Sequence, residues 1–253
     1  EIYTLSLHDA LPISLQVAAG CHPATHDWSI TMLLAVDTST QWVGIALYDS
    51  DRVVAELAWQ TRFHHTVELA PAVQDLMQRS GIKPAELKAL AVALGPGSFT
   101  SLRIGMALVK GMALALKIPV VGIPTLDVVA AAQPLQELPM AAILQAGRGR
   151  LAVGWYHAEK RGWKLQGEAA LMNIEDLSRA IEKPTLVCGE ITEAERQTLG
   201  KRRKTVLMTS PAHSTRRPGF LAELAWKRWQ NGHADDPALL APIYLRVADP
   251  IPE

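Results

Sequence analysis

Cysteine and net charge are the two scarce features of this sequence, and their scarcity limits the classes of protein it can belong to. The 253 residues contain two cysteines, Cys21 and Cys188, which stand far apart and not at a metal-binding spacing. This usage excludes a disulfide scaffold and fits a reducing cytoplasm, and we expect Cys188, in an apolar run, to be a buried thiol. Lys and Arg together number 25, as do Asp and Glu, so the zero net charge provides no bulk field for nucleic acid.

Several chemical signatures are also missing. No pair of histidines stands one helical turn apart on a predicted helix, the spacing with which a helix can hold a metal ion. His64 and His65 are adjacent, so on a helix their side chains point about 100° apart. We expect them to be surface or helix-start residues rather than metal ligands. No Ser-His-Asp set typical of a peptidase is evident, and no run is long and apolar enough to cross a membrane.

The first segment differs from the rest of the chain. Residues 1–31 contain neither lysine nor arginine, and therefore lack the positive n-region of a signal peptide. They contain Pro12 and Pro23 and show little periodicity, whereas Met32 opens a regular strand pattern. We expect 1–31 to be foreign to the fold, a translated sequencing adapter joined to the reading frame. A genuine, disordered extension is the alternative.

A glycine-rich turn between an apolar strand, 89–94, and an apolar helix, Leu102–Leu116, is the most distinctive stretch. It contains Gly95, Pro96, Gly97, Ser98, Phe99, Thr100, Ser101, Leu102 and Arg103. The glycines allow a tight turn and close backbone approach, and Ser98 or Thr100 can cap the helix. The turn could cradle a phosphate at the helix N-terminus. Because it lacks a Walker lysine, we favour a turn that positions the helix for packing.

This string resembles the hallmark of the TsaB (YeaZ-like) family, bacterial proteins of the machinery that makes threonylcarbamoyladenosine in tRNA. The family's usual form has a glycine where this chain has Ser101. The segment from Pro242 to Arg246 is similar to the family's closing Pro-x-Tyr-Leu-Arg, so the resemblance runs from about Met32 to Arg246. It implies an α/β fold of the actin-like (ASKHA) class, built from two ribonuclease-H-like lobes of βββαβαβα order.

The order of the predicted elements agrees with two such lobes. Residues 32–133 are predicted to form the N-terminal lobe, and 134–253 the C-terminal lobe and tail. In the second lobe the pattern predicts a third strand over Trp163–Ala169 and a last helix over Arg216–Gln230. The inward face of that helix is predicted to carry Phe220, Leu224 and Trp229.

A turn after the first strand resembles the first phosphate hairpin of the actin, hexokinase and Hsp70 superfamily. It consists of Asp37, Thr38, Ser39 and Thr40. That hairpin normally has a glycine where this chain has Ser39, and the TsaB pattern has an acid where it has Gln145. Two acids facing across a cleft normally hold Mg²⁺ for phosphoryl chemistry, so we predict a vestigial nucleotide hairpin and no ATP hydrolysis by this chain alone. Nearby Arg148 and Arg150 either face an anion or are solvated turn charges.

The resemblance implies a non-catalytic scaffold and dimerisation subunit. Its expected partner is a TsaD-type catalytic subunit, which transfers threonylcarbamoyl to adenosine 37 of tRNAs that read codons starting with A. A TsaE-type ATPase, and tRNA reached through the complex, are further expected partners; alone, the chain is expected to form a homodimer in the cytoplasm. No cofactor of its own is expected, and ATP or ADP at an interface shared with a partner stays open. The alternatives are an actin-like kinase or glycoprotease-like peptidase acting on its own, and a homodimer without a role in tRNA modification.

Two helices are predicted to form the partner surface. The helix over Leu102–Leu116 is apolar almost all round, and a small lobe cannot easily cover every side of it. The helix over His64–Ser80 has one apolar stripe, and with the equivalent pair of another chain the two would make a four-helix contact. The alternative is that both helices are wholly internal. The predicted contact residues are Leu69, Val73, Leu76, Met77, Leu102, Met106, Val109 and Met112.

Overall fold

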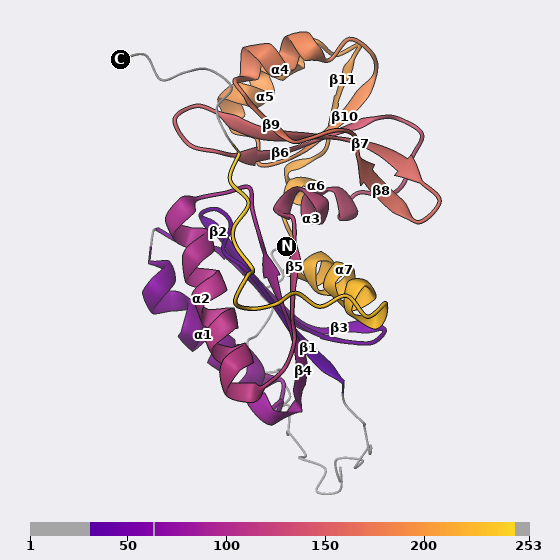
Figure 1. The fold of residues 1–253 in the computed structure, drawn as a ribbon. Coiled ribbons are helices and arrows are strands. Elements are labelled where there is room, and N and C mark those ends of the chain that lie inside the picture. The colour runs from indigo at the N-terminus through magenta and orange to yellow at the C-terminus, as the bar shows by residue number, and fades with distance from the viewer. Residues whose placement is uncertain (1–30, 63, 246–253) are drawn as a thin grey trace, which may run out of the picture.

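The computed structural model of the chain describes residues 31–62 and 64–245. These residues form two lobes, one above the other in Figure 1, each built around its own sheet. The predicted α/β class and the βββαβαβα order of the first lobe are confirmed. The prediction for the leader concerns residues that, apart from Thr31, lie outside the described part of the chain.

The first lobe contains a five-stranded sheet in the order β3-β2-β1-β4-β5, in which β1 is antiparallel to β2 and parallel to β4. Its strands are β1 (Met32–Asp37), β2 (Trp42–Asp49), β3 (Arg52–Gln60), β4 (Leu87–Ala93) and β5 (Val120–Ile123). Its helices are α1 (His65–Arg79), the 3₁₀ helix η1 (Pro84–Glu86), α2 (Phe99–Leu116) and α3 (Thr125–Ala131). Every residue of β1 is buried, because helices cover both faces of this sheet.

The second lobe contains a six-stranded sheet in which the path β11-β10-β6-β7-β8 is joined by β9 on β7. Its strands are β6 (Met140–Gln145), β7 (Leu151–Glu159), β8 (Gly162–Leu165), β9 (Ala170–Met172), β10 (Thr185–Gly189) and β11 (Val206–Met208). Helices α4 (Ile174–Ala180), α5 (Glu193–Gly200), α6 (Pro211–Ser214) and α7 (Pro218–Gln230) follow between and after them. The third strand predicted over Trp163–Ala169 is present as β8 but is shorter, because it ends at Leu165. Gly167 takes a φ of 68° in the turn that follows, and β9 begins only at Ala170; both strands pair with β7.

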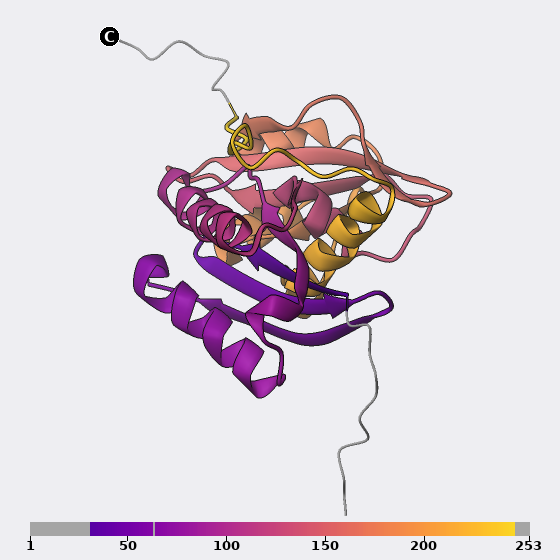
Figure 2. The same ribbon diagram turned by 60° about the horizontal axis from the view of Figure 1, so that its bottom comes forward.

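Helix α7 follows the second lobe in sequence but packs on the sheet of the first lobe (Figure 2). The predicted assignment of 134–253 to the second lobe is therefore wrong for this helix. Its predicted inward residues, Phe220, Leu224 and Trp229, do pack against this core but are only half-buried. The buried face carries Leu221, Ala222, Ala225 and Trp226. This face contacts Leu33 and Ala35 of β1, and its two alanines let the helix approach the sheet closely.

Helices α1 and α2 cover the opposite face of the first sheet, where they meet Leu34 and Val36. Seven of the eight predicted contact residues are buried in this core, and only Met112 is half-buried. The seven buried residues therefore face the sheet of their own lobe, and the prediction that they form the partner surface is wrong. The buried ones are Leu69, Val73, Leu76, Met77, Leu102, Met106 and Val109. The lobe's own sheet and helices cover these residues, so they are not available to a partner.

Helix α2 is longer than predicted and only partly covered. With Phe99 as its first residue it spans 18 residues, and by length and composition alone it could cross a membrane. The expectation that no segment meets this criterion is therefore wrong. One face of α2 packs on β4 and β1, which is the arrangement of a helix in a globular lobe. Its other face is exposed and includes Ala107, Gly111 and Leu114.

Close packing at Gly105 fixes where α2 lies on the sheet. A Cβ atom at Gly105 would overlap the Thr38 hydroxyl at the end of β1, whose Oγ1 donates a hydrogen bond to the Ser101 carbonyl at 2.7 Å. Gly111 lies further along the same helix, and a Cβ atom there would meet nothing within 4 Å.

We predict opposite effects for alanine at these two glycines. Gly105→Ala should lower the free energy of unfolding by about 1–3 kcal/mol, because the methyl group overpacks the contact with Thr38. Gly111→Ala, the matched control, should raise it by about 0.5–1 kcal/mol, because alanine favours a helix more than glycine does. Urea denaturation of the two variants measures both values. Equal effects in the two variants would contradict the packing described for α2.

Candidate functional site

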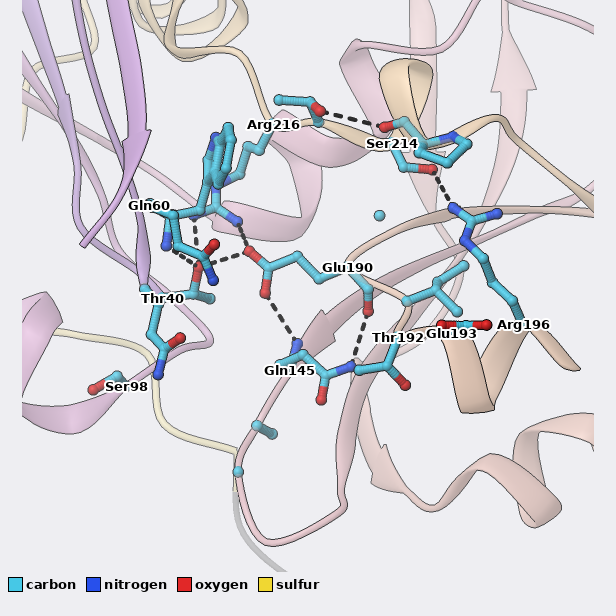
Figure 3. A pocket seen from close by; sticks show the side chains of 18 of the residues that line it. Thr40, Gln60, Ser98, Gln145, Glu190, Thr192, Glu193, Arg196, Ser214 and Arg216 are labelled. Carbon is cyan, nitrogen blue, oxygen red and sulfur yellow. Dashed lines mark hydrogen bonds and ion pairs between the residues drawn. The ribbon is translucent and has the colours of Figure 1, made fainter. Parts of the chain in front are cut away.

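A cavity of about 1070 Å³ lies between the two lobes. The first lobe contributes the turn after β1 and the start of α2, and the second lobe contributes the ends of β6 and β10 and the start of α5. Figure 3 shows side chains from both lobes pointing into it. Residues that line it include Thr40, Trp42, Gln145, Glu190, Arg196 and Arg216. The cavity is therefore the place where residues far apart in the sequence could act together.

The guanidinium of Arg216 is the centre of this site. Its Nε lies 2.5 Å from Asp37 Oδ2 and its Nη1 lies 2.6 Å from Glu190 Oε1, so one cation bridges a carboxylate from each lobe. Its Nη2 also donates to Thr40 Oγ1 at 3.2 Å and to the Trp42 carbonyl at 2.9 Å. Only 1% of the Arg216 side chain is exposed. Burial alone would lower the pKa of Arg216, but the charges of Asp37 and Glu190 raise it, so the group stays protonated.

Glu190 connects this ion pair to the rest of the cleft, as Figure 3 shows. Its Oε1 accepts a hydrogen bond from the Thr40 hydroxyl at 2.6 Å, while the Gln145 side chain donates to its carbonyl at 3.1 Å. Gln145 also donates to Glu195 at 2.9 Å. The residue that replaces the expected acid is thus a hydrogen-bond donor that holds the ends of β6 and β10 together.

The predicted nucleotide hairpin is folded on itself rather than open to a phosphate. The Ser39 amide donates to Asp37 Oδ1 at 2.9 Å, and the Thr38 hydroxyl donates to Ser101. The Ser39 hydroxyl lies 2.7 Å from that of Thr125. Asp37, Thr38, Ser39 and Thr40 are all buried, so the turn is a packed corner of the lobe.

The glycine-rich turn packs directly on that corner. The Ser98 amide donates to the Ser39 carbonyl at 2.7 Å, and a Cβ atom at Gly97 would overlap the same carbonyl. The Gly95 amide donates to Thr125 Oγ1 at 2.9 Å, and the Ser98 side chain caps α2 by accepting from the Ser101 amide. These amides already have partners within the chain, which favours the packing interpretation of the turn over a phosphate cradle.

The remaining motif residues lie outside the cleft. Phe99 and Arg103 are exposed, with the Arg103 guanidinium 3.8 Å above the Phe99 ring and Tyr244 stacked beside it. His64 is exposed as expected, whereas His65 is buried and its Nε2 lies 3.0 Å from the Thr40 carbonyl. His65 is not a surface residue but is the first residue of α1, as the helix-start alternative predicted, and its ring fixes that start against the turn.

Cys188 and the arginines of the second hairpin complete the set of predicted residues. Cys188 is buried, and burial raises the pKa of its thiol to about 12, so it is protonated and unreactive at neutral pH. Arg148 is exposed and Arg150 half-buried, and neither forms an ion pair within the described part of the chain. The structure thus leaves both proposed roles of these arginines open.

The cleft does not suit a divalent cation held between Asp37 and Glu190. Arg216 already lies between these carboxylates as the positive charge, and a metal ion there would face a buried like charge at contact distance. Among residues 31–62 and 64–245, no three His, Cys, Asp or Glu side chains are grouped as a metal site would require. What the arrangement does is hold the two lobes together by charge and hydrogen bonds.

Sequence reasoning identified Asp37 and Gln145 but missed Glu190 and Arg216. Glu190 follows the buried strand β10, and side chains at the carboxyl ends of parallel strands meet at one edge of a sheet. That signal could have placed Glu190 at the cleft. Arg216 stands only two residues before α7, and its burial depends on α7 returning to the first lobe, which no local pattern indicates.

Comparison with known proteins gives relatives of one functional group. The family model described as TsaD: tRNA N6-adenosine threonylcarbamoyltransferase matches residues 57–201. The chain is 32% identical over 225 residues to the tRNA threonylcarbamoyladenosine biosynthesis protein TsaB of Bacillus subtilis, covering 86% of this chain and 95% of that protein. It is 35% identical over 107 residues to a tRNA N6-adenosine threonylcarbamoyltransferase of Nitratidesulfovibrio vulgaris, covering 36% of this chain and 30% of the enzyme.

A solved structure agrees with these relatives. YeaZ from Pseudomonas aeruginosa superimposes with a TM-score of 0.71 at 25% identity, and the match covers 85% of this chain and all of that one. Two stacked lobes with the strand order β3-β2-β1-β4-β5 in the first are those of the actin-like fold that the sequence predicted.

We predict that the Arg216 bridge stabilises the protein strongly. Arg216→Met should lower the free energy of unfolding by about 3–5 kcal/mol, because it leaves the buried carboxylate of Asp37 and the partly buried one of Glu190 without their cation. Its neighbour Arg217 pairs with Glu56 at the surface, and Arg217→Met should cost less than about 1 kcal/mol. Urea denaturation of both variants tests the difference. A loss below 1 kcal/mol for Arg216→Met would show that the bridge is not a major source of stability.

Proposed function

The chain belongs to the TsaB family of tRNA threonylcarbamoyladenosine biosynthesis proteins, and on that basis we propose that it is a non-catalytic subunit that assembles with a TsaD-type transferase. The observation that carries the non-catalytic part is the position of Arg216 between Asp37 and Glu190. Phosphoryl chemistry on this fold needs carboxylates free to hold Mg²⁺. A buried guanidinium takes up both of these carboxylates, so the cleft acts as a structural clasp. The same observation disfavours a kinase acting on its own.

The surface offered to the partner is the exposed face of α2, which we call the α2 stripe. It consists of Ala107, Gly111, Leu114 and Ala115. These residues follow the i, i+4, i+7, i+8 pattern of one helix face, and Leu114 is 83% exposed. The neighbouring helix α1 also has exposed apolar residues, Val67, Ala70 and Pro71. An exposed apolar face of this kind marks an interaction site, and its small residues allow another helix to approach closely.

The comparisons support a related chain as the partner. The transferase family model matches 57–201, a range that includes α1 and α2. A transferase of that family therefore has an equivalent helix pair, and two such pairs can associate as a four-helix contact. In the absence of the transferase, a second copy of this chain would use the same face.

The other partners follow from the same proposal. A TsaE-type ATPase and tRNA would act on the assembled complex in the cytoplasm, and any ATP or ADP would bind at an interface shared with a partner. The chain itself supplies no group for the transfer reaction, since its motif residues are used in packing the first lobe.

We predict that a charge in the α2 stripe blocks assembly without unfolding the chain. Leu114→Arg should weaken binding to the TsaD-type subunit at least tenfold, because the contact would bury an unpaired cation. Leu207→Arg is the control, since Leu207 is an exposed leucine, 41% accessible, on β11 of the other lobe. Isothermal titration calorimetry gives the affinities, and circular dichroism checks folding. If folded Leu114→Arg binds like the unaltered chain, the stripe is not the interface.

We also predict that the purified chain neither hydrolyses ATP nor cleaves proteins above background. Working enzymes commonly turn over at about 1 s⁻¹ or faster, so a coupled ATPase assay and a general protease assay would detect such activity easily. Turnover that persists through further purification and disappears in Arg216→Met would refute the non-catalytic assignment.

A further inference from the structure

A run of four cations stands between α5 and β11 in the second lobe. It consists of Lys201, Arg202, Arg203 and Lys204. Lys201, Arg203 and Lys204 are exposed, and none of the three forms an ion pair with a carboxylate in the described part of the chain. Arg202 differs from them, because it is half-buried and donates to the Ile181 carbonyl at 3.1 Å.

The loop that carries these cations has a fixed shape. The Arg202 carbonyl accepts from the Thr205 amide at 3.0 Å and from the Val206 amide at 2.9 Å, and the Arg202 amide donates to the Leu199 carbonyl at 2.9 Å. Arg202 is thus the anchor of a folded turn. Since its side chain points back to the lobe, its neighbours along the run are the ones left at the surface.

A fifth cation joins this surface from another element. Strands β10 and β11 are parallel, with Thr185 opposite Val206, and the Thr185 amide donates to the Thr205 carbonyl at 2.8 Å. Lys183 and Lys204 each stand two residues before one of these paired positions. They therefore lie at the same end of the two strands, just before the amino ends of β10 and β11. Lys183 is also exposed and without an ion pair among the described residues. We call Lys183, Lys201, Arg203 and Lys204 the basic ridge.

Simpler roles account for only part of the basic ridge. A cation after α5 offsets the negative end of that helix, which explains Lys201. A lysine beside an edge strand discourages pairing with other chains, which explains Lys204 because β11 is at the sheet edge. Neither role requires two more exposed cations beside them, and the single acid next to Lys183, Glu182, does not balance the group.

We propose that the basic ridge binds the phosphate backbone of the tRNA on which the complex acts. The inference rests on the proposed function, which supplies an RNA substrate. Phosphate contacts come from Lys and Arg side chains, whereas lysine is depleted in protein interfaces and aromatic anchors are enriched there. The ridge consists of lysine and arginine and contains no aromatic residue, so RNA is favoured over an acidic protein as its partner.

The place of the ridge in the molecule suits this role. Helices α4 and α5 lie at the far end of the second lobe in Figure 1, away from α1 and α2 in the first. A partner bound to the α2 stripe would thus leave the ridge uncovered. Because the whole chain has zero net charge, the ridge acts as a local contact and needs the complex to hold the RNA.

The test uses the complex of this chain with a TsaD-type subunit and unmodified tRNA. The triple variant Lys201→Ala, Arg203→Ala, Lys204→Ala should weaken tRNA binding more than tenfold at about 0.1 M salt. The logarithm of the association constant should also fall less steeply with the logarithm of the salt concentration, its slope being smaller in magnitude by about 2 to 3. The control removes the same charge from the first lobe through Lys83→Ala, Lys88→Ala and Lys117→Ala, all exposed, and should change binding less than threefold. The conservative variant Lys201→Arg, Arg203→Lys, Lys204→Arg should bind like the unaltered complex.

Assembly without RNA is measured in parallel by gel filtration, so that the two proposals fail separately. If the complex does not form with the unaltered chain, the proposed function is wrong. If it forms and the triple alanine variant keeps its tRNA affinity and salt slope, the RNA contact is wrong. Loss of partner binding in the triple variant would also overturn it, since the ridge would then be a protein contact.

Discussion

One buried guanidinium holds this structure together. Arg216 reaches Asp37 in the first lobe and Glu190 in the second, and it lies almost wholly out of water. An isolated charge in that position would be very costly, so all three groups must be present together. The packing of the lobes against each other follows from this requirement, as does the lack of a free carboxylate pair in the cleft.

The glycine-rich motif serves the same end by a different means. Gly97 and Gly105 have no Cβ, which allows the turn before α2 and α2 itself to lie directly on the backbone and side chains of the turn after β1. That turn carries Asp37 and Thr40, both of which contact Arg216. A motif that looks like a ligand loop in the sequence thus acts through packing, by fixing the residues to which the lobes are joined.

The sequence pattern predicted the positions of strands and helices whose formation depends on nearby residues. The buried strand β1 and the amphipathic helix α1 were placed within a residue or two, because burial imposes a period on the sequence. The lobe order came from the same periods. What failed were choices set by distant parts of the chain, such as the lobe on which α7 packs and the face of α2 that is left exposed. Arg216 gave no local signal at all, since its partners are 179 and 26 residues away.

The return of α7 to the first lobe has a consequence for synthesis of the chain. Leu33 and Ala35 leave the ribosome early, but the helix that covers them is made only after the whole second lobe. Domains generally fold as units during synthesis, with the N-terminal one first, and that order is not available to this protein. One face of its first sheet waits for residues near position 220, so the second lobe can be complete while the first is still open.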